Sequence, residues 1–393
     1  MTRLLREAFD EWADEVRVPH DLADRALRRR AWKPVGAAVL VMAMIAAVAV
    51  FVGGQPESVV RPADALTLPA RPSPAPTDVR TDTEHSPPTK LIAAGGYAVS
   101  AYYVTSREQE RVRRTWSLYD PRTEGYEQTS YAWVDAAPGL QAAAVIDGDL
   151  LGNRVGVMDM NTRQILKWFD LEHSVGSVVW SPDGTKLLAT AYSSYPDLRR
   201  ADGPSTQRVP ESPRIGYYII DLQTGESSFH DLPAMKDIEP GEDPRPFNVN
   251  GRQDLGWSLD GTMIWEPTAT QPDKVFHTLD GQPREAPEGE RYAEHSPISG
   301  TSPDGRLVLG GSGLPTKITE AATGRVAGQQ RVLQLHAWAD DDNVIALGCA
   351  GKCENEFNAG LVLVSVDGSR TTQLAANFDS NKDGAWRWVL TPR

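Results

Sequence analysis

Residues 178–192 read VVWSPDGTKLLATAY, in which two apolar runs flank the tetrapeptide Ser181-Pro182-Asp183-Gly184. Proline presets the first angle of a tight turn, aspartate can bond back to the turn's backbone, and glycine accepts a positive φ. The two apolar runs have the length and the side chains of short β-strands. The stretch therefore predicts a pair of antiparallel strands joined by a tight turn.

The same pattern recurs along the chain. Later copies are LGWSLDGTMIWEP at 255–267, SGTSPDGRLVLGG at 299–311 and LHAWADDDNVIALG at 335–348, and a degraded copy, YAWVDAAPGLQAAAVI, lies at 131–146. Matching places are held by Trp133, Trp180, Trp257 and Trp338, with Thr301 in the remaining copy. A variable loop and two more strands follow each pair, which predicts four antiparallel strands per unit. Such a blade cannot bury both faces alone, so blades should stack around an axis.

The first unit is incomplete in the order of the sequence. Residues 97–129 predict strands around 97–103 and 115–119 but lack an innermost strand, whereas AWRWVL at 385–390 is a strand without a blade. We expect the C-terminal strand to complete the first blade and close the ring. The fold class is therefore all-β, a six-bladed propeller over residues 90–393, with seven blades as the alternative. The motifs resemble the WD40-like, TolB-type β-propeller family over about 95–393, which implies a fold without naming a reaction.

A different signal lies near the N-terminus. Residues 34–54, PVGAAVLVMAMIAAVAVFVGG, carry no charged side chain, and a span of the bilayer needs about 20 such residues. Arginines and a lysine precede the run more densely than they follow it, which predicts a cytoplasmic N-terminus and an extracytoplasmic C-terminal domain. A cleaved signal peptide with Ala47-Val48-Ala49 as its site is the rival. Its basic region would be unusually long, so an uncleaved single-pass anchor in the cell membrane is favoured.

Two segments flank this span. Residues 1–33 predict a tail with an amphipathic helix at 3–17, which could dock a cytoplasmic partner or stay solvated. The tail resembles the N-termini of bacterial membrane proteins found beside extracytoplasmic-function sigma factors, yet it has His20 and no cysteine, which excludes the zinc motif of zinc-type anti-sigma factors. Residues 55–89 are rich in proline and threonine and predict a disordered linker.

Composition and motifs narrow the function by exclusion. A net charge of −13 and a pI of about 5.1 argue against nucleic acid as a partner. The common hydrolase, zinc-protease and nucleotide-binding motifs do not occur, so we expect neither an enzyme nor a cofactor. Glu172-His173 and Glu294-His295 could converge as metal ligands or an acid–base pair, but their spacing favours polar loop residues and no metal site.

Cys349 and Cys353 are the two cysteines of the chain. Outside the membrane a close pair usually oxidises, and this pair has three intervening residues rather than the two of redox catalysts. A structural disulfide is therefore favoured over a thiol switch.

Loop lengths indicate where a ligand would bind. Tight turns should share one face of the ring, while insertions at 193–213, 235–253, 283–297 and 349–359 should share the other, and long loops on a rigid scaffold usually carry binding. The candidate binding face comprises Arg199, Arg200, Asp237, Glu239, Glu242, Asp243, Glu294, His295, Glu354 and Glu356. The favoured function is a membrane-anchored extracytoplasmic binding module for an unidentified protein or small ligand. A transmembrane signalling or anti-sigma-like regulator, and an enzyme with an unrecognised site in the propeller channel, are the alternatives.

Overall fold

The computed structural model describes residues 66, 68, 78–108, 110–198, 200–201, 207–208, 212–234, 252–267, 274–287, 290, 300–309, 316–355, 357–380, 382 and 384–393. All of them belong to the second of two units into which the chain divides, Val60–Arg393. Within these residues the fold is all-β. The predicted tail (1–33) and span (34–54) lie outside the described residues, and no helix in the described ranges is long and apolar enough to cross a membrane.

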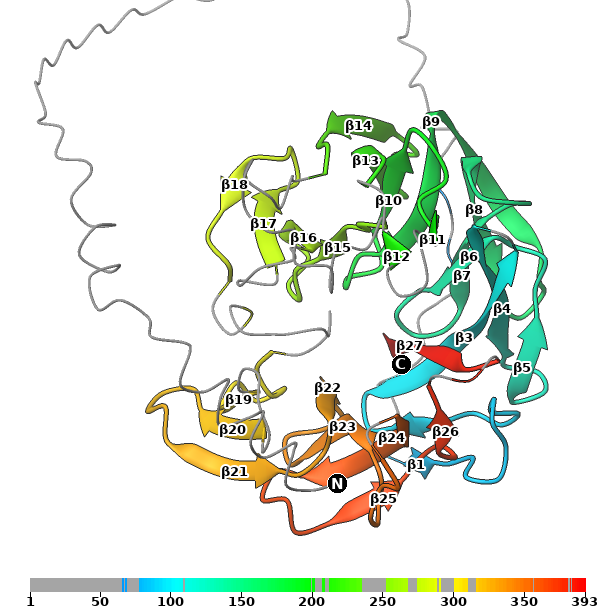
Figure 1. The fold of residues 1–393 in the computed structure, drawn as a ribbon. Helices are drawn as coiled ribbons and strands as arrows, with labels where there is room; N and C mark the ends of the chain where they lie inside the picture. Colours follow the sequence, from blue (N-terminus) through cyan, green and yellow to red (C-terminus); the bar gives the residue numbers. More distant parts are fainter. Residues whose placement is uncertain are drawn as a thin grey trace, which may run out of the picture. The chain divides into compact units, whose positions relative to one another are not determined.

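The first sheet joins the two ends of this unit. Its strands are β1 (Val79–Arg80), β2 (Ala93–Ala94), β3 (Tyr97–Glu108), β4 (Arg111–Asp120), β5 (Gly125–Gln128) and β27 (Trp386–Pro392). Strand β27 pairs antiparallel with β3, from Trp386 opposite Val104 to Pro392 opposite Tyr97. Figure 1 shows β27 beside β3, and this pairing confirms that the C-terminal strand completes the first unit.

The folded unit begins earlier than the predicted boundary at residue 90. Strand β1 pairs with β2, and Asp82 is buried, with its N–H bonded to the carbonyl of Leu374 at 2.9 Å. The carboxylate of Asp82 accepts hydrogen bonds from the N–H groups of Thr89 and Lys90. Residues 78–89 therefore belong to the fold rather than to the linker, because polar side chains fix them where apolar ones are few.

The second sheet has seven strands in the order β14-β13-β10-β9-β8-β7-β6. Their bounds are β6 (Trp133–Ala136), β7 (Ala142–Ile146), β8 (Gly152–Asp159), β9 (Ile165–Trp180), β10 (Lys186–Tyr192), β13 (Arg214–Asp221) and β14 (Ser227–Asp231). Strand β9 pairs with β8 mainly through its first half and with β10 through its second half. Two successive repeat units thus share one continuous strand. A separate ribbon pairs β11 (Arg200–Ala201) with β12 (Gln207–Arg208).

Three smaller sheets follow in chain order (Figure 1). The four-stranded sheet holds β15 (Gly256–Trp257), β16 (Met263–Pro267), β17 (Lys274–Thr278) and β18 (Pro283–Arg284). The three-stranded sheet holds β19 (Leu307–Leu309), β20 (Thr316–Glu320) and β21 (Val326–Gln330), and Thr301 forms a bridge to Val308 where the first strand was expected. The five-stranded sheet holds β22 (Gln334–Trp338), β23 (Asn343–Gly348), β24 (Asn358–Ser365), β25 (Thr371–Gln373) and β26 (Phe378–Asp379).

The repeated turns have one hydrogen-bond pattern. In the turn between β9 and β10, the hydroxyl of Ser181 donates to Asp183, Asp183 accepts the N–H of Thr185, and Gly184 has φ +73°. Equivalent Ser–Asp bonds occur at Ser258–Asp260, Ser302–Asp304 and Ser365–Asp367. The glycine is required because its φ lies in the left-handed region.

The matching tryptophans link neighbouring units. The indole N–H of Trp180 donates to the carbonyl of Asp135 at 3.0 Å, that of Trp257 to Val179 at 3.3 Å, and that of Trp338 to Gly300 at 2.9 Å. Buried apolar side chains pack between consecutive units, among them Trp116, Trp386 and Tyr217. Repeated antiparallel units that pack face to face through their cores, with the last strand joined to the first sheet, make the fold β-propeller-like.

Candidate functional site

The described loops opposite the tight turns surround one cavity of about 280 Å³. It is lined by the β3–β4 hairpin (Ser106, Glu108, Arg111, Arg113, Arg114 and Thr115), by 128–132, by 148–150 and by Tyr195. The β7–β8 loop supplies 148–150, and the β10–β13 connection supplies Tyr195. Each of these two loops leaves its strand at the end opposite the tight turn. We call this hollow the arginine cavity.

The hairpin of β3 and β4 is anchored to the β10–β13 connection. Arg111 forms a bridge to Leu198, and the N–H of Val112 donates to the carbonyl of Asp197 at 3.0 Å. The hydroxyl of Tyr195 donates to the carbonyl of Val112 at 2.8 Å. One wall of the cavity is therefore held by backbone as well as side-chain hydrogen bonds.

A buried ion network lies behind this wall. The carboxylate of Asp197 accepts hydrogen bonds from both terminal nitrogens of Arg114 and, at 2.9 Å, from Nε of Arg252. Arg252 also bonds Asp254 at 3.0 Å and the carbonyl of Gly176 at 2.9 Å. The side chains of Asp197 and Arg252 are 5% and 4% exposed, so this pair is shielded from water.

Aromatic rings and charge reinforce the network. The guanidinium carbons of Arg252 and Arg114 lie 4.7 and 5.7 Å from the ring centroid of Trp133, within cation–π range. Burial alone would raise the pKa of Asp197, but the guanidinium charges of Arg252 and Arg114 outweigh burial and hold that pKa below its usual value. The network therefore keeps the carboxylate of Asp197 charged at neutral pH.

A second buried network adjoins the first. Arg214 donates to the carbonyl of Gln253 at 3.2 Å and to the carboxylate of Glu266, and Glu266 also bonds Nε2 of His277 at 2.8 Å. Arg214 and Glu266 are almost fully buried. Because the N–H of Gln253 donates to the hydroxyl of Tyr192, residues 252–254 are fixed from both sides.

Most of the predicted binding face lies outside the described residues. This applies to Arg199, Asp237, Glu239, Glu242, Asp243, Glu294, His295 and Glu356. The backbone of Arg200 pairs with Arg208 in the β11–β12 ribbon. Glu354 accepts a hydrogen bond from the side-chain amide of Asn358 at 2.9 Å, inside the loop that carries the disulfide.

The glutamate–histidine pairs do not form a described site. The ring of His173 packs against Phe229 at 4.3 Å, and its backbone N–H bonds the hydroxyl of Tyr218. Residues 294 and 295 lie outside the described part. Among the described residues, no group of three or more histidine, cysteine, aspartate or glutamate side chains could hold a metal ion.

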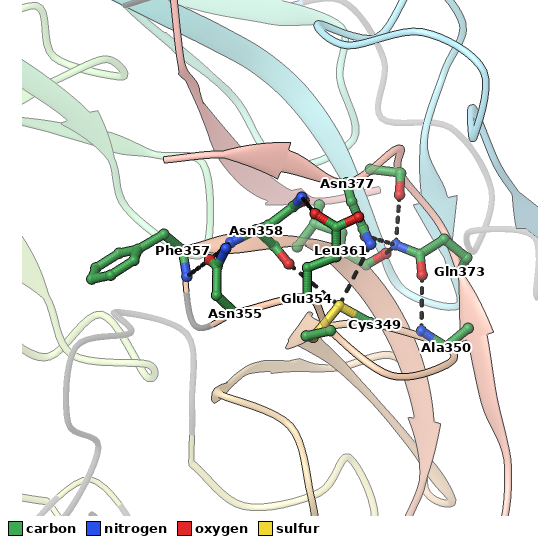
Figure 2. The surroundings of a disulfide bond; sticks show 11 residues. Cys349, Ala350, Glu354, Asn355, Phe357, Asn358, Leu361, Gln373 and Asn377 are labelled. Atoms are coloured by element: carbon green, nitrogen blue, oxygen red, sulfur yellow. Dashed lines mark hydrogen bonds between the residues drawn. A yellow bond between two sulfur atoms is a disulfide. The ribbon is translucent and has the colours of Figure 1, made fainter. Parts of the chain in front are cut away.

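The predicted disulfide between Cys349 and Cys353 is confirmed. Figure 2 shows its surroundings: the side-chain amide of Asn377 lies 3.5 Å from Sγ of Cys349, and Gln373 accepts the N–H of Ala350 at 2.9 Å. Asn355 caps the same loop by accepting the N–H groups of Phe357 and Asn358. The disulfide therefore belongs to a loop that hydrogen bonds also order.

Sequence reasoning missed the residues of the arginine cavity. It located the insertions at 193–213 and 235–253 but did not connect Asp197 in one with Arg252 in the other. The run Arg111-Val112-Arg113-Arg114 was a usable signal, because alternating charged side chains on a hairpin that extends past its sheet are exposed to a neighbouring loop.

Comparison with known proteins assigns this chain neither a family nor an activity. No family model matches this chain, and no curated relative matches it. The solved structures similar to it include TolB from Acinetobacter baumannii, with 16% identity over 75% of this chain and 67% of that one and a TM-score of 0.37. An acylaminoacyl peptidase from Pyrococcus horikoshii is 14% identical over 74% of this chain and 46% of that one, with a TM-score of 0.39. The Cps50 (Swd1) β-propeller domain of Myceliophteria thermophila is 11% identical over 75% of this chain and 89% of that one, with a TM-score of 0.36. TM-scores this low transfer no activity or partner, so the class of the protein, β-propeller-like, rests on its own sheets.

Proposed function

We propose that this protein is a non-enzymatic binding module, a six-bladed propeller held outside the cell membrane by a single N-terminal span. The blade count follows if the seven-stranded sheet is two units that share β9 and the other four sheets of three or more strands are one unit each. The span is supported by the uncharged run at 34–54 and by the basic residues before it.

The arginine cavity is the observation that carries the binding role. Loops from three successive units converge there, and the ion pair of Asp197 with Arg252 fixes two of the insertions relative to each other. A surface whose loops are ordered before a ligand arrives loses less conformational entropy on binding. The repeated turns at the opposite ends of the strands are short, and their polar groups bond within the turns themselves.

Site-specific photo-crosslinking in intact cells tests the binding role. A photoreactive amino acid at Asp149, whose side chain is 80% exposed on the cavity rim, should form adducts with a partner. The same residue at Asp183, in a tight turn at the opposite end of the strands, is the matched control and should not. Equal adduct yields at the two positions would contradict the proposal that the partner binds at the cavity.

Labelling of engineered cysteines tests the anchoring. An impermeant reagent should reach a cysteine at Ser73 in whole cells and should miss one at Thr2. The reverse pattern would overturn the proposed orientation. Labelling of both positions in intact cells would contradict a membrane span between them.

A further inference from the structure

The arginine cavity holds hydrogen-bond donors that the described protein does not satisfy. Within the described residues, Arg111 has no carboxylate at ion-pair distance, and its guanidinium carbon lies 5.1 Å from the ring centroid of Tyr195. In the same part of the chain, Nε of Arg114 and Oγ1 of Thr129 are buried and lack hydrogen-bond partners. Leaving a buried polar group unsatisfied costs about 1–3 kcal/mol, so such groups usually have a role.

The acidic residues of the cavity pair with an arginine other than Arg111. Arg113 pairs with Glu108 at 2.8 Å and with Asp149 at 3.2 Å. Both terminal nitrogens of Arg114 donate hydrogen bonds to Asp197. Arg111 is therefore the arginine of the lining that forms no ion pair with a described carboxylate.

We propose that the arginine cavity binds a small ligand through an anionic group, either a phosphate or a carboxylate, held by the guanidinium of Arg111. This deepens the proposed binding function and rests on it. A planar guanidinium presents paired N–H donors that match the oxygens of either anion. The Thr129 hydroxyl supplies a further hydrogen bond in the same cavity. At about 280 Å³ the cavity is near the lower limit of small-molecule sites, which suits a ligand of a single ring or less.

Arg111 is well placed for this role because its side chain is not part of the structural core. It is exposed, and its stacking on Tyr195 orients the guanidinium without consuming its N–H donors. Replacing it should therefore change binding more than stability. Thr129 offers an opposite test, because replacing an unsatisfied buried hydroxyl by a methyl of the same shape should leave stability unchanged or raise it.

Isothermal titration of the full-length chain in detergent tests the proposal, with inorganic phosphate in one arm and galacturonate in the other, at constant ionic strength set with sodium chloride. We expect saturable binding of at least one anion. Arg111→Gln should weaken it about tenfold or more, as loss of a charged hydrogen bond implies. Thr129→Val should weaken it severalfold while the melting temperature stays equal or rises. Arg284→Gln, an exposed arginine on β18 away from the cavity, is the matched control and should bind as the unaltered chain does.

The outcomes separate this proposal from the broader one. Saturable binding in only one arm identifies the anion and supports the site. No saturable heat with either anion, or equal loss in Arg111→Gln and Arg284→Gln, overturns the anion site. If the titration contradicts the anion site but adducts at Asp149 persist in the Arg111→Gln chain, the proposed binding face is supported and the anion site is not. Anion binding without any adduct at Asp149 would support the anion site and contradict the binding of a macromolecular partner at this face.

Discussion

Nε of Arg252 donates a hydrogen bond to the carboxylate of Asp197 at 2.9 Å, and the two residues come from different insertions of the repeat. Asp197 lies in the connection after β10, and Arg252 precedes β15. Their side chains are almost fully buried, and Arg114 of the first sheet approaches the same carboxylate. One aspartate therefore ties together loops from separate parts of the chain.

Asp197→Asn should destabilise the fold strongly. The amide cannot balance the charges of Arg114 and Arg252, and removing one partner of a buried pair typically costs about 3–5 kcal/mol. Urea unfolding followed by tryptophan fluorescence measures the change. Asp149→Asn, which alters an exposed ion pair of Arg113, should cost less than about 1 kcal/mol. Similar losses in the two variants would show that the Asp197 network contributes no more than a surface pair.

The pH dependence of stability should include a contribution from Asp135. Burial raises the pKa of Asp135 from 3.8 to about 7, although the N–H of Trp180 bonds its carboxylate. The folded state therefore holds this proton more tightly than the unfolded state. Its stabilising contribution is fully present below pH 3.8 and is lost as pH rises towards 7.

Asp135→Asn isolates that contribution, because the amide oxygen can still accept the Trp180 hydrogen bond but cannot ionise. Between about pH 4 and 7 the free energy of unfolding of the variant should fall less, or rise more, than that of the unaltered chain. Parallel pH profiles from chemical denaturation would contradict the raised pKa.

The C-terminal strand should be essential for folding. Trp386 is 1% exposed and packs against Phe378, Trp388 and Tyr102. Trp386→Ala should cost about 3–5 kcal/mol, as large-to-small changes in cores do. Deleting residues 385–393 should leave the edge of β3 unpaired and cause aggregation. Arg387→Ala, at an exposed position of the same strand, should be nearly neutral. Thermal unfolding and size-exclusion chromatography distinguish these cases, and a deleted chain of unchanged stability would refute closure through β27.

Cys353→Ser should have a modest effect. The disulfide closes a loop of few residues, so its loss should cost less than about 3 kcal/mol and leave the sheets intact. Mass spectrometry of the unreduced chain establishes whether the bond is present, and calorimetry measures the cost. Free thiols in the chain isolated from an oxidising compartment would instead favour a redox switch.

Local features of the fold could be predicted because their causes are local. Asp183 and Gly184 determine a turn within a few residues, and Cys349 and Cys353 are close in sequence. The closure by Trp386 could also be predicted, because an unpaired strand at one end matched a missing strand at the other. The turn and the closure depended on a repeat, and the disulfide on a short spacing, each of which can be read without knowing any long-range contact.

The candidate site could not be predicted in the same way. Arg114, Asp197 and Arg252 lie in loops of unequal length, where the repeat gives no register. Their hydrogen bonds span 83 and 55 positions, and loop residues of opposite charge have many possible partners before the fold is known. The extension of the fold to Asp82 was missed for a similar reason, since its stabilising partners are backbone groups that composition does not reveal.

The pairing of β27 with β3 has a consequence for biosynthesis. The hydroxyl of Ser100 donates a hydrogen bond to the carbonyl of Val389 across this pairing, and the two residues are 289 positions apart. Until strand β27 has left the ribosome, the edge of β3 with which it pairs is uncovered. The nascent protein must therefore avoid pairing with other chains until this strand has emerged, because an unpaired strand edge is a template for aggregation.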